Sequence, residues 1–277
     1  MDYDAMATTY ESLEPWYEHL YDTLHAIVRA ELTPPGEPRG RALDAGCGTG
    51  FQAAVLASLG YRTHGLDVSA GLLAVARRRR PSIVLARGDI ESLPYARETF
   101  DAVTCCGSTL SYVHAPARAL AEIGRVLRPE GLLLLECEHR WSLDLLWEAI
   151  SSLTGDSLGY GLHPRDVWRH LGARGEAGCR LPYPGYGTIR LFSVREIRAW
   201  LDAAGLEPVG MWGIHVLTNV IPSTVLHRQR LAGPLARCYR ILCSLDDGLR
   251  RLPLAARAAN SLVMLARKRS TARPHEP

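Results

Sequence analysis

Lysine is almost absent from this chain of 277 residues, where Lys268 is the only lysine among 32 basic residues. Phosphate-binding loops of the Walker type and Schiff-base chemistry both depend on a lysine side chain, and the first half of the sequence has none. The sequence therefore excludes phosphoryl transfer of the Walker type.

Paired cysteine motifs and a strong excess of charge are missing as well. The seven cysteines include no C-x-x-C pair, and Cys105 and Cys106 are adjacent, which is unlike a disulfide framework or a zinc site. We expect reduced, mostly buried thiols and no metal site. The net charge of +3 is far from the cationic balance that phosphate contacts require, so nucleic acid is not an expected partner.

A long apolar run is also absent. The most apolar stretch, residues 208–226, is interrupted by glycine, histidine, asparagine and proline, which makes it a poor membrane-spanning helix. The first twenty residues have neither the basic region nor the apolar core of a secretory signal. Because 47% of the residues are hydrophobic, the composition is that of a folded protein, and we expect a cytoplasmic location.

From Arg41 onwards, short apolar runs alternate with amphipathic stretches. The runs predict strands at 41–46, 61–68, 82–89, 100–106 and 131–138, with helices at 51–60, 69–80 and 115–128 between them. This order is typical of an α/β fold with a parallel sheet. A capping box at Ser193 and Glu196 predicts a helix over 194–204, and strands are expected within 206–217 and 261–268.

The same pattern divides the chain into four expected segments. Residues 1–34 form a helical cap, and residues 35–140 form a cofactor-binding core. Residues 141–192 are an insertion, rich in glycine, proline and tyrosine towards its end, with a helical centre near 164–171. It follows the fifth strand, at the carboxyl edge of the sheet, so we expect it to act as a substrate lid, with a packed elaboration of the fold as the alternative. Residues 193–277 complete the sheet and add cover helices.

The most informative motif is Leu43-Asp-Ala-Gly-Cys-Gly-Thr-Gly50, between the first predicted strand and the first predicted helix. Glycines remove the Cβ atoms that would keep a ligand from the backbone, and the loop leads into a helix N-terminus. Asp67 and Asp89 follow the next two strands, where carboxylates can accept hydrogen bonds from a ribose and an adenine amine. The spacing G-x-G-x-G differs from the dinucleotide fingerprint, so an adenosine-like ligand without phosphate is expected.

With these residues in view, the sequence resembles the class I S-adenosylmethionine-dependent methyltransferases over residues 35–138. The matching motifs are LDAGCGTG, GLDVS, RGDIESLPY, FDAVTCCGSTLSYV and LRPEGLLLLE. The resemblance implies a Rossmann-like, seven-stranded, mostly parallel sheet with helices on both faces and an antiparallel last strand. It also implies S-adenosylmethionine as cofactor and S-adenosylhomocysteine as its product.

The resemblance further implies a set of cofactor-binding residues. Asp44 would face the methionine amino group, Asp67 would hold the ribose, and Tyr10 of the helical cap would reach the cofactor. The remaining residues would line the methionine and ribose (Gly46, Cys47, Gly48, Gly50), flank or read the adenine (Val68, Asp89, Ile90) and close the pocket after strand four (Cys106, Gly107).

Methyl transfer from a sulfonium is an in-line displacement, so the protein mainly has to align its reactants and exclude water. An oxygen or nitrogen acceptor also needs a base, and the candidates are His114 after strand four and His139 after strand five. The aromatic cap, the tyrosine-rich insertion and the apolar segment 206–226 indicate a small, moderately hydrophobic or aromatic acceptor, methylated on O or N, or on C or S.

Several alternatives remain open. The arginine-rich region 226–257 suits a lipid or quinone methyltransferase at an anionic membrane, or a solvated cover helix. Cofactor-binding residues do not prove turnover, so a non-methylating S-adenosylmethionine-binding protein is a further alternative. Arg77 to Arg80 suit a nucleic-acid patch or, more simply, the C-terminal end of a helix dipole. The acceptor and the oligomeric state are not readable from the sequence.

Overall fold

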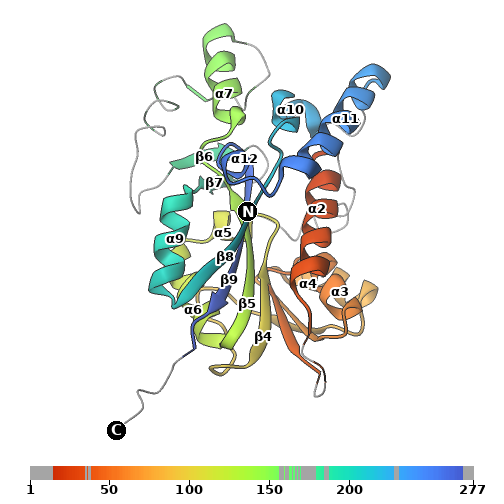
Figure 1. Ribbon diagram of the computed structural model, residues 1–277, viewed down its shortest axis with the longest axis vertical. Coiled ribbons are helices and arrows are strands. Elements are labelled where there is room, and N and C mark those ends of the chain that lie inside the picture. The colour runs from red at the N-terminus through yellow and green to blue at the C-terminus, as the bar shows by residue number, and fades with distance from the viewer. Residues whose placement is uncertain are drawn as a thin grey trace.

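The computed structural model describes residues 15–155 except positions 35, 37 and 38, then residues 179–183, 187–227 and 231–270, and the separate positions 159, 162, 163, 165, 167 and 169. A single seven-stranded sheet forms the centre (Figure 1). Its strands are β1 (Arg41–Ala45), β2 (Arg62–Asp67), β3 (Val84–Arg87), β4 (Phe100–Cys105), β5 (Leu127–Glu138), β8 (Leu206–Ile214) and β9 (Ser261–Lys268).

The strand order is β3-β2-β1-β4-β5-β9-β8. Neighbouring strands from β3 to β5 are parallel, whereas the last strand, β9, runs antiparallel to both β5 and β8. The predicted sheet with an antiparallel last strand is therefore confirmed. The order reverses at β1 and β4, so the carboxyl ends of these two strands flank the point where open α/β sheets bind ligands.

Helices cover both faces of the sheet, as predicted. They are α2 (Pro15–Glu31), α3 (Phe51–Ser58), α4 (Ala70–Arg79), α5 (Thr109–Tyr112), α6 (Pro116–Val126), α7 (Leu143–Thr154), α9 (Val194–Ala203), α10 (Ser223–Leu226), α11 (Gly233–Leu249) and α12 (Pro253–Ala256), with a 3-10 turn, η2 (Thr218–Val220). Two buried clusters result, one under α6 and α9 and one under α2 and α3. No helix among the described residues is long and apolar enough to cross a membrane.

The local capping signals of two helices are confirmed. The Ser69 side chain accepts a hydrogen bond from the Leu72 amide at the start of α4. Ser193 and Glu196 form the predicted capping box at the start of α9. These signals are local in the chain, so tertiary contacts are not needed to place them.

Two expectations about the second half differ from the structure. The strand predicted within 206–217 ends at Ile214, because His215 adopts a positive φ of 58° and turns the chain into η2. The insertion contains α7 and a two-stranded antiparallel sheet, β6 (Cys179–Tyr183) and β7 (Gly187–Leu191), which periodicity did not indicate. Most of the helix expected near 164–171 lies outside the described residues.

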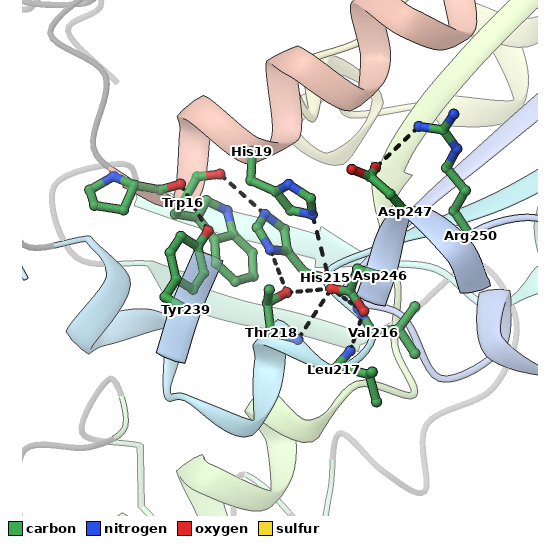
Figure 2. A network of polar contacts seen from close by, with 11 residues as sticks. Trp16, His19, His215, Val216, Leu217, Thr218, Tyr239, Asp246, Asp247 and Arg250 are labelled. Carbon is green, nitrogen blue, oxygen red and sulfur yellow. Dashed lines mark hydrogen bonds and ion pairs between the residues drawn. The ribbon is translucent and has the colours of Figure 1, made fainter. Parts of the chain in front are cut away.

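A buried polar network joins α2 to the C-terminal helices (Figure 2). His215 stacks on Trp16 with ring centroids 3.6 Å apart, and its Nδ1 lies 3.0 Å from the Thr218 hydroxyl. The Asp246 carboxylate of α11 accepts hydrogen bonds from three consecutive amides, those of Val216, Leu217 and Thr218. This network fixes the N-terminal end of α2 at the carboxyl edge of the sheet, close to α10 and α11, while the rest of α2 packs on the face of the sheet (Figure 1).

Candidate active site

Glycines with positive φ shape the loop between β1 and α3. The φ angles of Gly46, Gly48 and Gly50 are 85°, 51° and 80°. A Cβ at Gly46 would lie 2.3 Å from Cγ2 of Thr109, so a larger residue does not fit there. Gly50 is the N-cap of α3. The loop therefore brings bare backbone and a helix N-terminus to the edge of the sheet, as the motif predicts.

The Asp67 carboxylate at the end of β2 holds this loop in place. Its Oδ2 accepts a hydrogen bond from the Gly48 amide at 2.8 Å, and its Oδ1 accepts one from the Ser69 amide at 2.9 Å. Asp67 thus connects the glycine loop to the start of α4. It also lines the adjacent cavity, so a bound ligand would meet a carboxylate that is already oriented.

A cavity of about 250 Å³ lies over this edge of the sheet, and we call it the cofactor cleft. It is lined by segments that follow β1, β2, β3 and β4. Seven of the predicted cofactor residues lie together on its wall: Gly46, Gly48, Asp67, Val68, Asp89, Ile90 and Gly107. Val68 is 51% exposed and Ile90 is almost fully buried, so most of the apolar surface that these two residues offer to a flat ring comes from Val68. Leu72, Thr109 and Tyr112, which the sequence did not indicate, also line the wall, together with Gly88, Glu91, Val113 and His114.

A smaller extension of about 30 Å³ shares Gly46, Gly48 and Gly107 with the cofactor cleft and reaches Asp44, Cys47 and Cys106. Oδ1 of Asp44 accepts a hydrogen bond from the Thr104 hydroxyl at 2.8 Å, whereas its buried Oδ2 has no hydrogen-bond partner among the described residues. Burial raises the pKa of Asp44 to about 7. A positively charged group nearby would favour the ionised form of this carboxyl.

These features fit S-adenosylmethionine. The glycine loop offers backbone with no Cβ, Asp67 and Asp89 present carboxyls beside a nucleoside-sized cavity, and Asp44 lacks a partner for one oxygen within the described part of the chain. The cofactor's ammonium and sulfonium charges suit such an acidic, phosphate-free edge. Gly50 lies at the start of α3 and does not line either cavity.

Tyr10 lies outside the described residues. Another tyrosine of the N-terminal segment, Tyr21 on α2, lines the small extension. A Cβ at Gly107 would lie 3.0 Å from the Tyr21 hydroxyl, and the Tyr21 ring packs edge-on against Phe51. Nothing in the sequence of the N-terminal helix indicated which loop Tyr21 would meet.

A second cavity, of about 50 Å³, lies beyond the end of β5, and we call it the acceptor cavity. Its walls come from α2, β5, α7, the β6–β7 hairpin and the start of β9. They are formed by Trp16, Glu138, His139, Ser142, Asp144, Leu145, Glu148, Leu162, Leu181, Ile189, Leu191, His227 and Asn260. This cavity brings together residues that are far apart in the sequence.

Ser108 connects the cofactor cleft to the acceptor cavity. Its neighbours Gly107 and Thr109 line the cleft, and its own hydroxyl donates a hydrogen bond to Oε1 of Glu138, which lines the acceptor cavity. The Ser108 amide donates to Oε2 of Glu136 at 2.7 Å. Ser108 has a φ of 57°, an uncommon conformation for a residue other than glycine, and such conformations cluster at functional sites.

Glu136 and Glu138 are neighbouring carboxyls on one face of β5. Burial raises the pKa of Glu136 to about 7, and burial together with the charge of Glu136 raises the pKa of Glu138 to about 8. Two such carboxyls close together disfavour double ionisation, so the pair retains a proton near neutral pH. In the sequence, both residues fall within the predicted strand 131–138 and nothing sets them apart.

The two predicted base histidines lie in different places. His114 is exposed and lines the cofactor cleft beside Ile90 and Glu91. His139 is 1% exposed and lines the acceptor cavity. Its Nδ1 lies 3.1 Å from the Ala259 carbonyl oxygen, so Nδ1 carries the hydrogen and Nε2 is the acceptor. Burial lowers the pKa of His139, which keeps the ring neutral.

The thiols near the site are buried. Burial raises the pKa of Cys47, Cys105, Cys106 and Cys137 above the ordinary value, so none is poised as a thiolate. In the described part of the chain, no group of three or more His, Cys, Asp or Glu side chains could hold a metal ion.

Comparisons with known proteins identify the family of the chain. A methyltransferase-domain family model matches residues 43–135. A malonyl-[acyl-carrier protein] O-methyltransferase of Pectobacterium atrosepticum is 31% identical over 205 residues, covering 72% of this chain and 74% of that protein. A demethylmenaquinone methyltransferase of Renibacterium salmoninarum is 36% identical over 146 residues, covering 49% of this chain and 60% of that protein.

The chain spans 60% or less of the length of the first curated relatives it matches. Among solved structures, an S-adenosylmethionine dependent methyltransferase from Mesorhizobium loti has a TM-score of 0.55 and 20% identity, covering 87% of this chain and 96% of that one. That likeness supports the fold, and the sequence relatives support the family. This protein therefore belongs to the class I S-adenosylmethionine-dependent methyltransferases.

Proposed function

We propose that this protein transfers a methyl group from S-adenosylmethionine to a nitrogen or oxygen atom of a small acceptor with an apolar or aromatic body. The observation that carries the proposal is the arrangement of two cavities on either side of Ser108. One has the glycine loop and the carboxyls of a nucleoside site, and the other is mostly apolar. Their proximity suits a reaction between two bound molecules.

When bound, S-adenosylmethionine supplies an electrophilic methyl group on a positively charged sulfur. Asp67 and the glycine loop hold the nucleoside in the proposed mechanism, and Asp44 neutralises the amino group. Leu145 of α7 and Ile189 and Leu191 of β7 cover the acceptor cavity and reduce the access of water. Alignment of this kind contributes about 7–11 kcal/mol to lowering a barrier in well-oriented systems.

His139 is the proposed proton acceptor for an acceptor atom that must lose a hydrogen. Its neutral ring presents Nε2 as a base, and its side chain lines the cavity in which the acceptor would lie. A positioned base typically contributes about 10²–10⁴-fold to the rate. The exposed His114 lies at the other cavity, so the proposal assigns the base to His139.

Binding of S-adenosylhomocysteine tests the cofactor half of the proposal. We expect the product to raise the melting temperature of the protein, because a ligand that binds only the folded state stabilises it. Asp67→Ala should abolish this rise, whereas Glu207→Ala, which removes an exposed carboxyl on β8, should retain it. Stabilisation by NAD instead of S-adenosylhomocysteine would contradict the assignment.

Label transfer tests the catalytic half. Incubating the protein with methyl-labelled S-adenosylmethionine and a metabolite extract should yield a labelled small molecule. Tight binding of the cofactor without transfer to any acceptor would contradict the proposed activity and favour a non-methylating binding protein.

A quinone or lipid acceptor at a membrane surface is the second candidate. Ile241 and Leu245 lie one turn apart on α11 and are 62% and 51% exposed, and Arg237 and Arg240 are exposed on the same helix. Exposed apolar residues flanked by arginine suit an anionic lipid surface. One of the relatives described above is a demethylmenaquinone methyltransferase.

Vesicle flotation distinguishes this candidate from the first. If the acceptor is membrane-bound, the protein should float with vesicles that contain anionic lipid, and Ile241→Ser with Leu245→Ser should lose most of that binding. Protein that stays in the unbound fraction with anionic vesicles at low salt would argue against a membrane acceptor.

A further inference from the structure

The charge of the acceptor cavity is one-sided. Its charged lining residues on the described part of the chain are Glu138, Asp144 and Glu148, and neither arginine nor lysine is among them. A carboxylate or phosphate acceptor would meet like charge and lose its hydration without an ionic partner. The cavity therefore disfavours an anionic acceptor.

Two of these carboxyls serve to hold the walls together. Asp144 accepts a hydrogen bond from Nδ2 of Asn260 at 2.6 Å and another from the Ser223 amide. These two bonds join α7 to the segment before β9 and to the start of α10. Oε1 of Glu148 accepts a hydrogen bond from the Leu162 amide. These contacts account for the positions of Asp144 and Glu148 without a ligand.

Three acceptor atoms in the lining have no partner among the described residues. Oδ1 of Asn260 is buried, and its orientation follows from the amide nitrogen that donates to Asp144. Nδ1 of His139 donates to the Ala259 carbonyl oxygen, so Nε2 is the ring nitrogen without a partner in the described part of the chain, and His139 is 1% exposed. The Ser108 hydroxyl donates to Oε1 of Glu138, so Oε2 is the carboxyl oxygen without a partner within the same residues. An amide oxygen, an imidazole nitrogen and, once Glu138 is ionised, a carboxyl oxygen thus suit a ligand that brings hydrogens.

Apart from Ser142 and His227, the rest of the lining is apolar. Leu145, Leu181, Ile189 and Leu191 form one wall, and the buried Trp16 of α2 belongs to the lining as well. An apolar body would bury against the leucine and isoleucine side chains.

We infer that the acceptor cavity binds a primary or secondary amine on an apolar body, with Glu138, His139 and Asn260 around the nitrogen. This inference rests on the proposed methyl-transfer function and names its substrate class. The amine enters as an ammonium ion, and one N–H proton first passes to Glu138 or His139, which frees the nitrogen lone pair. The lone pair then forms the bond to the methyl carbon while the carbon–sulfur electron pair stays on sulfur. The product is a methylated ammonium ion beside neutral S-adenosylhomocysteine, so that charge and atoms balance.

The groups around Glu138 suit this role. Burial raises the pKa of Glu138, Glu136 on the same strand and Asp144 on α7 raise it further, and the hydrogen bond from the Ser108 hydroxyl opposes them. The carboxyl therefore keeps its proton in the unliganded protein, and an ammonium ion replaces that proton as it binds. Entry of an amine and ionisation of Glu138 are coupled.

Three probes that share a phenyl body test the inference on the full-length protein with S-adenosylhomocysteine bound. They are 2-phenylethylamine, 2-phenylethanol and 3-phenylpropionate, each at about 10 mM in a melting-temperature assay. We expect the amine to raise the melting temperature above that of the complex with S-adenosylhomocysteine alone, and the carboxylate to leave it unchanged. An equal rise with the carboxylate, or no rise with the amine, would overturn the inference.

Variants and turnover sharpen the result. Glu138→Gln should weaken the binding of 2-phenylethylamine about tenfold or more, whereas the exposed Glu207→Gln should not change it. Label from methyl-labelled S-adenosylmethionine should reach the amine at least about tenfold faster, in kcat/KM, than the alcohol. Unchanged amine binding by Glu138→Gln would refute the role of Glu138. If that variant does not fold, the comparison of the three probes on the wild-type protein still tests the inference.

The outcomes also separate this inference from the proposed function. If S-adenosylhomocysteine stabilises the protein and an extract is methylated while the amine neither binds nor accepts label, only the amine preference fails. If S-adenosylhomocysteine itself does not bind, the proposed function fails first.

Discussion

Two kinds of carboxyl surround the site, and they differ in how they are partnered. Asp67 accepts hydrogen bonds from two backbone amides, an arrangement that stabilises the charged form. Glu138 is half-buried, lies beside Glu136 and has a hydroxyl as its only hydrogen-bond donor within the described residues. The first suits the holding of a ligand in fixed geometry, and the second suits the exchange of a proton.

This difference predicts how stability changes with pH. The pKa of Glu138 is raised from 4.5 to about 8 in the folded protein, so between these values the folded protein keeps a proton that the unfolded chain has lost. Its contribution to the free energy of unfolding is therefore complete at low pH and is lost as the pH rises towards 8. The wild type should lose stability relative to Glu138→Gln over this interval.

Urea denaturation of the wild type and of Glu138→Gln at a series of pH values measures this difference in the free energy of unfolding. The difference in the free energy of unfolding between the wild type and Glu207→Gln, whose carboxyl is exposed on β8, should stay nearly constant with pH. A difference between wild type and Glu138→Gln that does not change between about pH 5 and pH 8 would contradict the raised pKa.

At the scale of single elements, α9 shows which features of a helix the local sequence determines. Ser193 accepts a hydrogen bond from the Glu196 amide, and Glu196 accepts one from the Ser193 amide. The helix then buries Ile197 and Leu201 in the cluster that also contains residues of α6. The cap defines where α9 begins, and the apolar residues define which side packs.

Removing the cap should therefore weaken the whole fold by a modest amount. We expect Ser193→Ala to lower the free energy of unfolding by about 1 kcal/mol, because the Glu196 amide loses its partner. Ser244→Ala, at an exposed position of α11, is the matched control and should change stability by less than about 0.5 kcal/mol. Equal midpoints of chemical denaturation for the two variants would show that the capping box contributes nothing.

At the scale of the whole molecule, the N-terminal helix and the C-terminal helices are held together over the sheet. Trp16 and His19 of α2 meet His215 after β8 and Asp246 of α11, which lie in the last third of the chain (Figure 2). Trp16 also lines the acceptor cavity, so this network determines one wall of the site. Stability and site geometry are coupled here.

Asp246→Ala should be strongly destabilising. It removes the partner of the Val216, Leu217 and Thr218 amides and of the Thr218 hydroxyl, and each unsatisfied buried group costs about 1–3 kcal/mol. Asp247→Ala removes only an exposed pair with Arg250 and should cost less than about 1 kcal/mol. If thermal melts show similar losses for both variants, the network is not the anchor we describe.

The sequence alone determined the core of the fold and the cofactor side of the site. Strand and helix periodicity, the glycine loop and the acids after the second and third strands are local patterns. Because the carboxyl ends of parallel strands meet at one edge, local patterns suffice to bring Gly48, Asp67 and Asp89 together. The hairpin of β6 and β7 was not predicted, since its strands are short and follow a stretch dominated by glycine and proline.

Only the tertiary structure decided the acceptor side. The lining residues Trp16, Glu138, Ile189 and Asn260 come from four separate parts of the chain, and no spacing links them. In the sequence, Glu138 is an ordinary residue of a predicted strand, and only the structure shows that Ser108 and Glu136 lie beside it. The physical reason is that burial, pKa and unpaired hydrogen-bond acceptors depend on which distant elements pack together, and periodicity in one segment carries no information about its partners.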